Sequence, residues 1–562
     1  MAGCCIAAHA QCSSPSGPTA GEDARIAQLY SQQKWAEVVR VAETRNTRDA
    51  DANFDLGMSL AHLGRWKEAH RALLAGAHAC PTQKRFPIEL AGVAFEQKQY
   101  AEAARWLRRG LHLDPKDEYA NNFLGTVYYL SGNLDAAIRY WNRVQKPRIA
   151  ALDLDPHARI HRLLLDRSFA FAPASILRQG QLATTETRLD SLGIFPAWNL
   201  RLDPRSDGTF NAVFRAEELN GFGGSRLEAL VSTLGGLPYA TAYPRYTNIG
   251  RSAMNFDSLL RWDPQKRRAW LSLSAPLHEL PQRRWDVSAD WRNENWAIRR
   301  SFTGAAPLLG SLHLDRELAA ANFTGMPRGR LRWSLGAELS HRTFTDVTYG
   351  SALTPTLITP GFAIKQLASI DTRLADAPQH RFTLDAGAGS DLGRTFASSS
   401  RVFEKLQGSA LAHWFPQFTG DRYELSQQLR AGKIFGTAPF DELYLLGMDR
   451  DDTNLWMRAH IATRDGRKGS GPTGDGYFLA NTDFYRRLYG NGLISIHAGP
   501  LLDIARVSAP TTGLSTPQWL VDTGVEARLT VLHTSVVLSY GRDLRTGANA
   551  FYGALSPQNV AP

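Results

Sequence analysis

Apolar and small side chains recur every 34 residues through the first quarter of this 562-residue chain. Several independent series share that spacing, which indicates a repeated structural unit and not chance agreement. The recurring positions are Trp66, Tyr100 and Leu134; Ala69, Ala103 and Ala137; and Leu73, Leu107 and Trp141. The pattern therefore predicts pairs of packed helices, with one pair in each repeat.

Thirty-four residues is the length of one tetratricopeptide helix pair, and small residues would let the two helices approach closely. We predict an all-α tetratricopeptide solenoid over residues 22–144, with three full repeats and a partial one around Trp35. Such an array offers a concave surface to peptides or protein partners, although a structural spacer is the alternative. The predicted packing positions are Gly57, Ala69, Ala91, Ala103, Gly125 and Ala137.

Residues 145–217 have the pattern of a small α+β domain. The order is strand, helix, helix, strand, strand, and Asp207-Gly208 is a hairpin turn signal before the last strand. The expected segments are 148–154, 158–165, 184–192, 197–202 and 209–216. With the phrase TETRLDSLGIF before the hairpin, this order resembles a single polypeptide-transport-associated (POTRA) domain. The resemblance implies a periplasmic domain that receives clients by strand addition; an unrelated α+β linker domain is the alternative.

Short segments of alternating hydrophobicity fill the rest of the chain, 218–562. In one of them Leu335 and Leu339 alternate with Ser334, Glu338 and Ser340. An apolar face opposite a polar face suits lipid outside a barrel and water inside it. At about 10 residues per strand, this length predicts an antiparallel transmembrane β-barrel of about 16 strands. A water-soluble sandwich would also alternate and remains the alternative.

Three further stretches carry a family resemblance. PFDELYLLGMDRDDTNLWMRAH, GPTGDGYFLANTDFYRRLY and GPLLDIARV resemble, in order and spacing, the C-terminal half of the BamA/TamA-type outer-membrane assembly and two-partner-secretion transporter superfamily, also called surface antigen barrels. The resemblance implies an extracellular loop folded into the lumen, with Arg458, Ala459 and His460 at its tip. It also implies that Arg458 pairs with Asp503 on an inward-facing strand. The glycines of the family's two motifs are alanine here, at Ala459 and Ala505.

Composition and motifs argue against several classes of function. The net charge is +10, but Lys and Arg are spread without a basic block, which argues against nucleic acid as a partner. The sequence contains no catalytic, phosphate-binding or metal-binding motif, so we expect neither an enzyme nor a catalytic residue, cofactor or metal. Ala8-His9-Ala10 and the Ser/Pro/Gly-rich stretch behind it make 1–21 a predicted signal-peptide remnant and spacer, with a disordered N-terminus as the alternative.

Together these patterns predict a multidomain protein of a Gram-negative outer membrane, with the TPR and POTRA regions in the periplasm. We expect those regions to receive protein clients and the barrel to insert or export them. The alternative is a TPR-linked export porin for exopolysaccharide or surface lipoprotein. The sequence identifies no client and does not separate membrane insertion from secretion.

Overall fold

The computed structural model describes residues 20–44, 49–223, 230, 233, 240–299, 308–396, 400–448, 455–491, 494–508, 519–531 and 534–557. The predicted leader around Ala8-His9-Ala10 lies outside these residues. The chain divides into two compact units. One comprises 1–148 with 176–179, and the other comprises 149–175 with 180–562. Because the second unit holds both the α+β domain and the barrel, the predicted boundary at 217/218 stays a prediction.

The first unit is built from consecutive helix pairs. The second helices of three pairs begin at Trp66, Tyr100 and Leu134, so the pairs keep the 34-residue spacing of the sequence. The segment around Trp35, expected as a partial repeat, is a pair of two helices. The helices are α1 (Ala20–Ser31), α2 (Trp35–Glu43), α3 (Ala50–His62), α4 (Trp66–Ala79), α5 (Arg85–Glu96), α6 (Tyr100–Leu113), α7 (Glu118–Leu130) and α8 (Leu134–Trp141).

Small side chains lie where the two helices of a pair meet. A Cβ atom on Gly57 would lie 2.6 Å from Cγ of Leu73, and one on Gly125 would collide with the Trp141 ring. Ala91, at the matching position of the middle repeat, is fully buried. The three alanines on the second helices, Ala69, Ala103 and Ala137, are also fully buried. All six predicted packing positions therefore lie inside the helical unit, where larger side chains would force the helices apart.

The α+β domain has the five elements expected from the sequence. It consists of β1 (Ile149–Asp153), α9 (Arg162–Ser168), α10 (Gln179–Leu192), β2 (Ala197–Pro204) and β3 (Phe210–Glu217). The sheet order is β1-β3-β2, with β1 parallel and β2 antiparallel to β3. The expected helix over 158–165 was wrong in its limits, because residues 156–161 are turn and coil and α9 begins only at Arg162.

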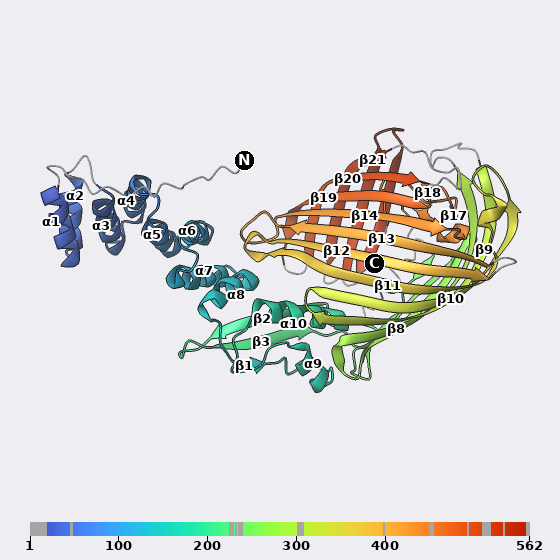
Figure 1. Cartoon of the computed structure of the whole chain (residues 1–562), viewed down its shortest axis with the longest axis horizontal. Helices are drawn as coiled ribbons and strands as arrows, with labels where there is room; N and C mark the ends of the chain where they lie inside the picture. The colour runs from blue at the N-terminus through green and yellow to red at the C-terminus, as the bar shows by residue number, and fades with distance from the viewer. Residues whose placement is uncertain are drawn as a thin grey trace, which may run out of the picture. The chain divides into compact units, whose positions relative to one another are not determined.

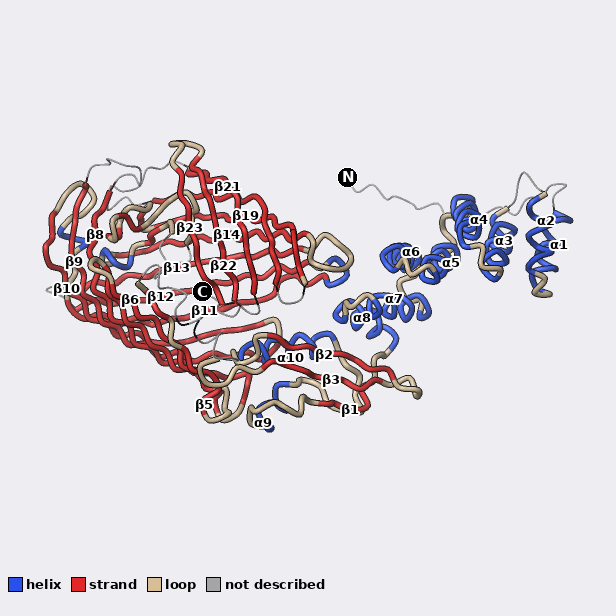
Figure 2. The backbone as a smooth tube through the Cα atoms, turned by 180° about the vertical axis from the view of Figure 1, so that it is seen from behind, coloured by secondary structure: helices blue, strands red, loops and turns tan. Residues whose placement is uncertain are grey.

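Helix α10 packs directly on the turn between two barrel strands (Figures 1 and 2). The Gly329 amide donates to the Thr184 hydroxyl at 3.0 Å, and the Thr187 hydroxyl donates to the Gly329 carbonyl at 3.1 Å. A side chain at Gly329 would collide with the backbone of Ala183. The end of the helix is also tied down, since Asn255 donates to the Leu192 carbonyl at 2.8 Å.

The rest of the second unit is one large antiparallel sheet that curves around a lumen (Figures 1 and 2). Eighteen strands of the described residues belong to it, of which β16 (Thr463–Arg464) and β17 (Arg467–Lys468) are two-residue strands inside the long loop. The other described strands number sixteen, in line with the expected number of about 16, and two of them, β4 and β5, both pair with β6. They are β4 (Thr241–Ala242), β5 (Arg245–Ile249), β6 (Met254–Trp262), β7 (Lys266–Leu277), β8 (Leu280–Arg299), β9 (Leu308–Arg328), β10 (Leu331–Thr348), β11 (Gly361–Ala377), β12 (Phe382–Phe396), β13 (Ser400–Trp414), β14 (Tyr423–Gly436), β19 (Gly476–Gly490), β20 (Ile494–Ser508), β21 (Leu520–Val531), β22 (Thr534–Asp543) and β23 (Asn549–Pro557).

The in–out alternation of the strands follows the sequence pattern. Leu335 and Leu339 are 52% and 53% exposed on the outer face, whereas Glu338 is buried on the lumenal side. Neighbouring strands place further large apolar side chains outside, as on a lipid-facing barrel surface. The sandwich alternative is wrong, because these strands form a single curved sheet. Among the helices of the described residues, none is long and apolar enough to cross a bilayer.

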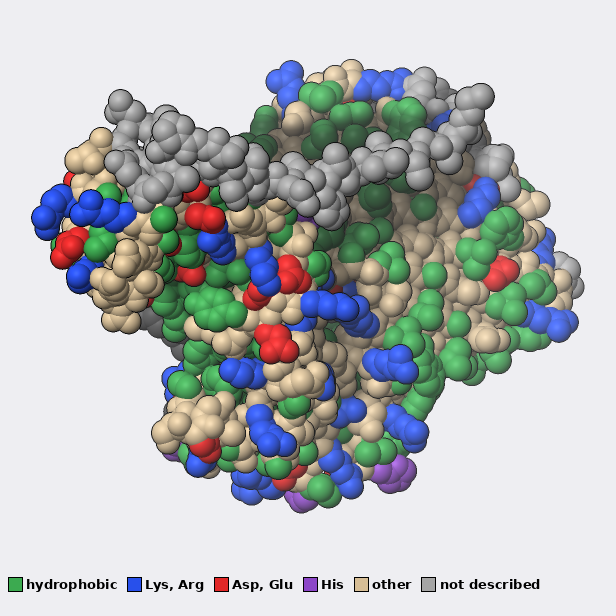
Figure 3. Space-filling model, turned by 60° about the vertical axis from the view of Figure 1, so that its left-hand side comes forward, with side chains coloured by type: hydrophobic (Ala, Val, Ile, Leu, Met, Phe, Trp, Pro, Cys, Tyr) green, Lys and Arg blue, Asp and Glu red, His purple; other side chains and the backbone are tan. Residues whose placement is uncertain are grey.

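Charged side chains of both signs lie on the face of the molecule drawn in Figure 3. On the described part of the face drawn in Figure 3, Lys and Arg lie among Asp, Glu and hydrophobic side chains and form no single basic patch. The expectation that nucleic acid is not a partner stays a prediction.

We predict that Ala91→Leu destabilises the helical unit by about 1–3 kcal/mol, because three added carbon atoms would overpack the contact between paired helices. Denaturant unfolding followed by far-ultraviolet circular dichroism measures this change. The matched control is Ala101→Leu at an exposed position of α6, where the same substitution should be nearly neutral. Equal destabilisation by both variants would contradict the close packing at Ala91.

We also predict that Asp55 makes the helical unit less stable at neutral pH. Burial, with smaller contributions from Asp51 and Asp49, raises the pKa of Asp55 to about 6, although Arg85 opposes the shift. Stability is therefore lost as pH rises from about 4 towards 6, and Asp55→Asn should recover it above that range. Because the carboxyl is only half buried, we expect a gain of about 1 kcal/mol or less at neutral pH.

The measurement is urea unfolding at about pH 4 and about pH 7.5, on either side of this interval. Glu118→Gln, at an exposed position of α7, serves as the control and should show no comparable gain. A gain for Asp55→Asn that is the same at both pH values would contradict the assignment.

Candidate functional site

The candidate site is the long connection between β14 and β19, which folds into the barrel lumen. Its described residues are 437–448 and 455–475. Apolar residues of this loop, including Phe440, Leu446 and Met457, share one buried cluster with wall residues such as Trp296. Inside the loop, β15 (Tyr444–Leu445) pairs with β18 (Thr473–Gly474), so its two arms hold one another. The loop is therefore a packed part of the barrel interior.

The tip of the loop, residues 456–460, places Arg458 against Asp503 of β20, as the family resemblance implied. Arg458 Nη2 lies 2.6 Å from Asp503 Oδ1, and Nε lies 3.0 Å from Oδ2. The backbone amide of Arg458 also donates to Oδ2 at 2.9 Å. Both side chains are buried, at 4% and 0% exposure. This two-pronged, charge-assisted geometry fixes the side chain and the backbone of the tip together.

Two more carboxylates hold the same guanidinium. Arg458 Nη1 lies 3.1 Å from Glu526 on β21, and it also contacts Asp483 on β19. Asn481 donates to Asp503 at 2.7 Å. Reasoning from the sequence missed Asp483 and Glu526. Their inward register on neighbouring strands is the only signal that could have pointed to them.

His460 and Ala459, also at the tip of the loop, both contact strand β21. The His460 ring nitrogen Nδ1 lies 2.9 Å from Asp522, and the Ala459 amide donates to the same carboxylate at 2.8 Å. Both His460 and Asp522 are fully buried. Neither Ala459 nor Ala505 is among the residues with positive φ, so alanine is accommodated in both motifs without backbone strain.

The tip also rests on the strand after β21. A side chain at Gly541 of β22 would collide with the backbone of Arg458, so the loop and this strand are in direct contact. Trp456 at the start of the tip lies near Tyr552 of β23, with ring centroids 6.4 Å apart. With the Asp483 contact on β19, the loop tip therefore touches five successive strands, β19 to β23.

A second charged cluster lies at the root of the loop, residues 438–446. Asp441 and Glu442 are both only 3% exposed and face cations from the wall. Glu442 lies 3.0 Å from Arg316, 3.2 Å from Lys365 and 3.3 Å from Arg342. The sequence analysis included Asp441 and Glu442 in a stretch that carries the family resemblance, but it gave them no role.

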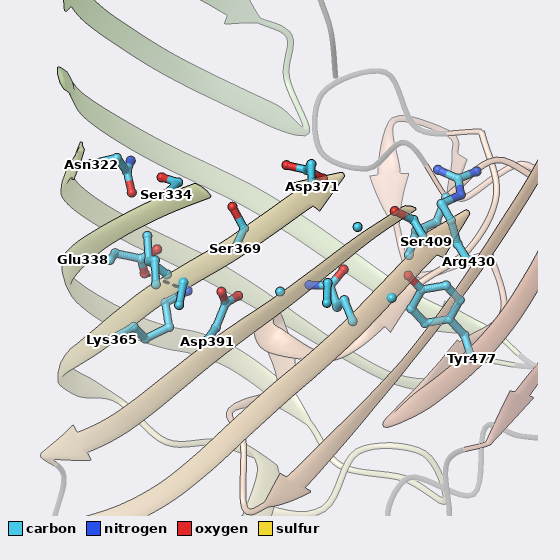
Figure 4. A pocket seen from close by; sticks show the side chains of 18 of the residues that line it. Asn322, Ser334, Glu338, Lys365, Ser369, Asp371, Asp391, Ser409, Arg430 and Tyr477 are labelled. Atoms are coloured by element: carbon cyan, nitrogen blue, oxygen red, sulfur yellow. Dashed lines mark ion pairs between the residues drawn. The ribbon is translucent and has the colours of Figure 1, made fainter. Parts of the chain in front are cut away.

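Part of the lumen beside the loop is open. A cavity of about 530 Å³ lies against the inner faces of β9 to β14 and is bordered by the loop residue Leu455. Figure 4 shows Glu338, Lys365 and Asp391 at one end and Arg430 and Tyr477 at the other. Its lining is mainly polar, as expected of a water-filled passage. Within the described part of the chain, no group of His, Cys, Asp and Glu side chains could hold a metal ion.

The chain matches no family model and no curated protein. Solved structures are similar in fold. CdiB from Escherichia coli has a TM-score of 0.50 at 12% identity, over 73% of this chain and 76% of that one. BamA from Haemophilus ducreyi lacking POTRA domains 1–3 has a TM-score of 0.43 at 10% identity, over 73% and 85%. CdiB from Acinetobacter baumannii has a TM-score of 0.43 at 11% identity, over 75% and 81%. The likeness to the E. coli protein shows a shared fold.

We predict that Arg458→Ala frees the loop tip, because it leaves several buried carboxylates without their cation. Losing one partner of a buried pair costs about 3–5 kcal/mol. Hydrogen exchange of residues 455–462 in the purified barrel should therefore accelerate strongly. Arg458→Lys should restore protection only in part, since a compact ammonium cannot make the two-pronged contact.

The matched control is Arg506→Ala, which removes an exposed arginine from the same strand as Asp503. Its exchange in the tip should equal that of the wild type. If Arg458→Ala also leaves the tip protected, the tip does not depend on this pairing.

Proposed function

We propose that this protein is an outer-membrane pore that inserts or exports polypeptides, and that its helical and α+β regions receive the clients in the periplasm. The observation that carries the proposal is a charged loop fixed inside the polar lumen of a barrel whose outer face is apolar. The resemblance of the loop and β20 motifs to the BamA/TamA-type superfamily supports the same function. The fold shared with CdiB from E. coli is consistent with it.

The two ends of the barrel support an orientation. The β9–β10 turn lies against α10, whereas the connection from β14 to β19 opens at the opposite end of the strands. We infer that the α+β domain lies on the periplasmic side and that the long loop starts from the outer side. Within this proposal, the α+β domain is a POTRA domain and the helical unit is a tetratricopeptide array.

The edge strand β2 is our candidate for first contact with a client. Among the described strands it pairs with β3 alone, and we propose that its other edge accepts an added strand. Asn199 and Arg201 are exposed along it. An unfolded segment that pairs there would gain backbone hydrogen bonds without any requirement for a particular sequence. That suits a domain that handles unfolded chains.

The helical unit offers a second candidate surface. Asp55 and Glu89 occupy the same position in successive repeats, 34 residues apart, and burial raises the pKa of both. Tyr30 lies close enough that both carboxylates raise its pKa, after burial itself. We propose that this face contacts a peptide or a partner protein. The alternative of an exopolysaccharide or lipoprotein porin is not favoured by the fold comparisons.

We predict that the native product fractionates with the outer membrane and migrates as a heat-modifiable barrel on gels. A photo-crosslinking residue at Asn199 should capture periplasmic polypeptides, because β2 is an open edge. The same probe at Ala212, in the buried central strand β3, should capture none. Recovery of the native product from the cytosol, or equal capture at both positions, would overturn the proposal.

A further inference from the structure

The root and the tip of the loop carry opposite charges, and each meets the opposite charge on the wall. At the root, the loop contributes Asp441 and Glu442. The wall contributes four cations, one from each of β9, β10, β11 and β13: Arg316, Arg342, Lys365 and Lys405. The carboxylates of the loop thus fill the centre of a basic sector of the lumen.

Contacts at the root are dense and shared. Arg316 bridges Glu442 and the wall residue Glu338, at 3.0 Å to each. Lys365 does the same, at 3.2 Å and 2.9 Å. Lys405 reaches the second Glu442 oxygen at 3.3 Å. A single carboxylate therefore touches all four cations, three of which are also buried.

The polarity reverses at the tip. There the loop brings Arg458 and His460, and the wall presents four carboxylates from β19, β20 and β21: Asp483, Asp503, Asp522 and Glu526. Without the loop, the root sector would keep its four cations with Glu338 as their wall partner, and the four carboxylates at the tip would face one another. Buried charges without enough partners are strongly unfavourable. The loop thus complements two oppositely charged parts of the same wall.

We propose that this loop is an electrostatic tie across the lumen, and that Glu442 positions its root as Arg458 positions its tip. The two anchors bind different strands and share no side chain, so each can open while the other holds. Loss of Arg458 frees the tip but leaves the root inside the barrel, and loss of Glu442 does the reverse. The inference rests on the proposed function in one respect, since the tie affects transport only if clients pass through this barrel.

The test measures each anchor separately with a buried alanine changed to cysteine. Ala438 reports on the root and Ala459 on the tip, and the two are 5% and 1% exposed. Labelling of the full-length protein by a water-soluble maleimide is quantified at each position by peptide mass spectrometry. Glu442→Gln should raise labelling at 438 about tenfold or more, equivalent to about 1.4 kcal/mol in the opening equilibrium, with little change at 459. Arg458→Ala should give the opposite result.

Glu424→Gln is the matched control, because Glu424 is a lumenal carboxylate of β14 whose partners, His413 and Arg528, lie on other wall strands. Heat-modifiable migration shows that each variant has a folded barrel. If Glu442→Gln does not assemble, Lys405→Gln removes one cation and should open position 438 to a smaller extent.

Two results would contradict the proposal that the loop is held by two independent anchors. The first is labelling at 438 that is no greater in Glu442→Gln than in Glu424→Gln. The second is simultaneous opening of both positions in either single variant, which would mean that one anchor holds the whole loop. Client export, measured in the same cells, tests the proposed function independently. Normal export with the expected labelling would support the tie and count against the proposed function.

Discussion

Compensation of buried charge is the constraint on which the interior of this barrel depends. Closely spaced strands bring charged side chains from neighbouring registers into one confined space, where an isolated charge is costly. Glu294 on β8 illustrates the solution, because Lys468 of the loop reaches it at 2.7 Å with both side chains buried. The loop therefore supplies the missing counter-charges and completes the interior of the barrel.

Much of the fold could be predicted from local periodicity. The 34-residue spacing depends on contacts between adjacent helices, and alternation along Leu331–Thr348 depends only on which face meets lipid or lumen. Limits of short elements were less predictable, as α9 shows, since turn geometry between 156 and 161 decides where that helix begins. The tip pairing was expected only because the motifs around Arg458 and Asp503 resemble a known family.

The root of the loop could not be predicted, for a physical reason. Arg316 and Glu442 are 126 residues apart in sequence, and Arg342 and Glu442 are 100 apart. Their contact depends on the register of several strands and on the entry angle of the loop. A short-range sequence pattern does not determine strand register or the entry angle of the loop. Glu442 is therefore an ordinary acidic residue in the sequence and a central one in the structure.

The tight turn at Gly329 has a mechanical consequence. It joins β9 and β10, and it lies so close to α10 that no side chain fits between them. The same two strands carry Arg316 and Arg342 further along their length, where both arginines form ion pairs with Glu442 of the loop. A tilt of the α+β domain and a displacement of the loop would thus pull on the same pair of strands from opposite ends. The β9–β10 hairpin therefore links the position of the α+β domain to the position of the loop.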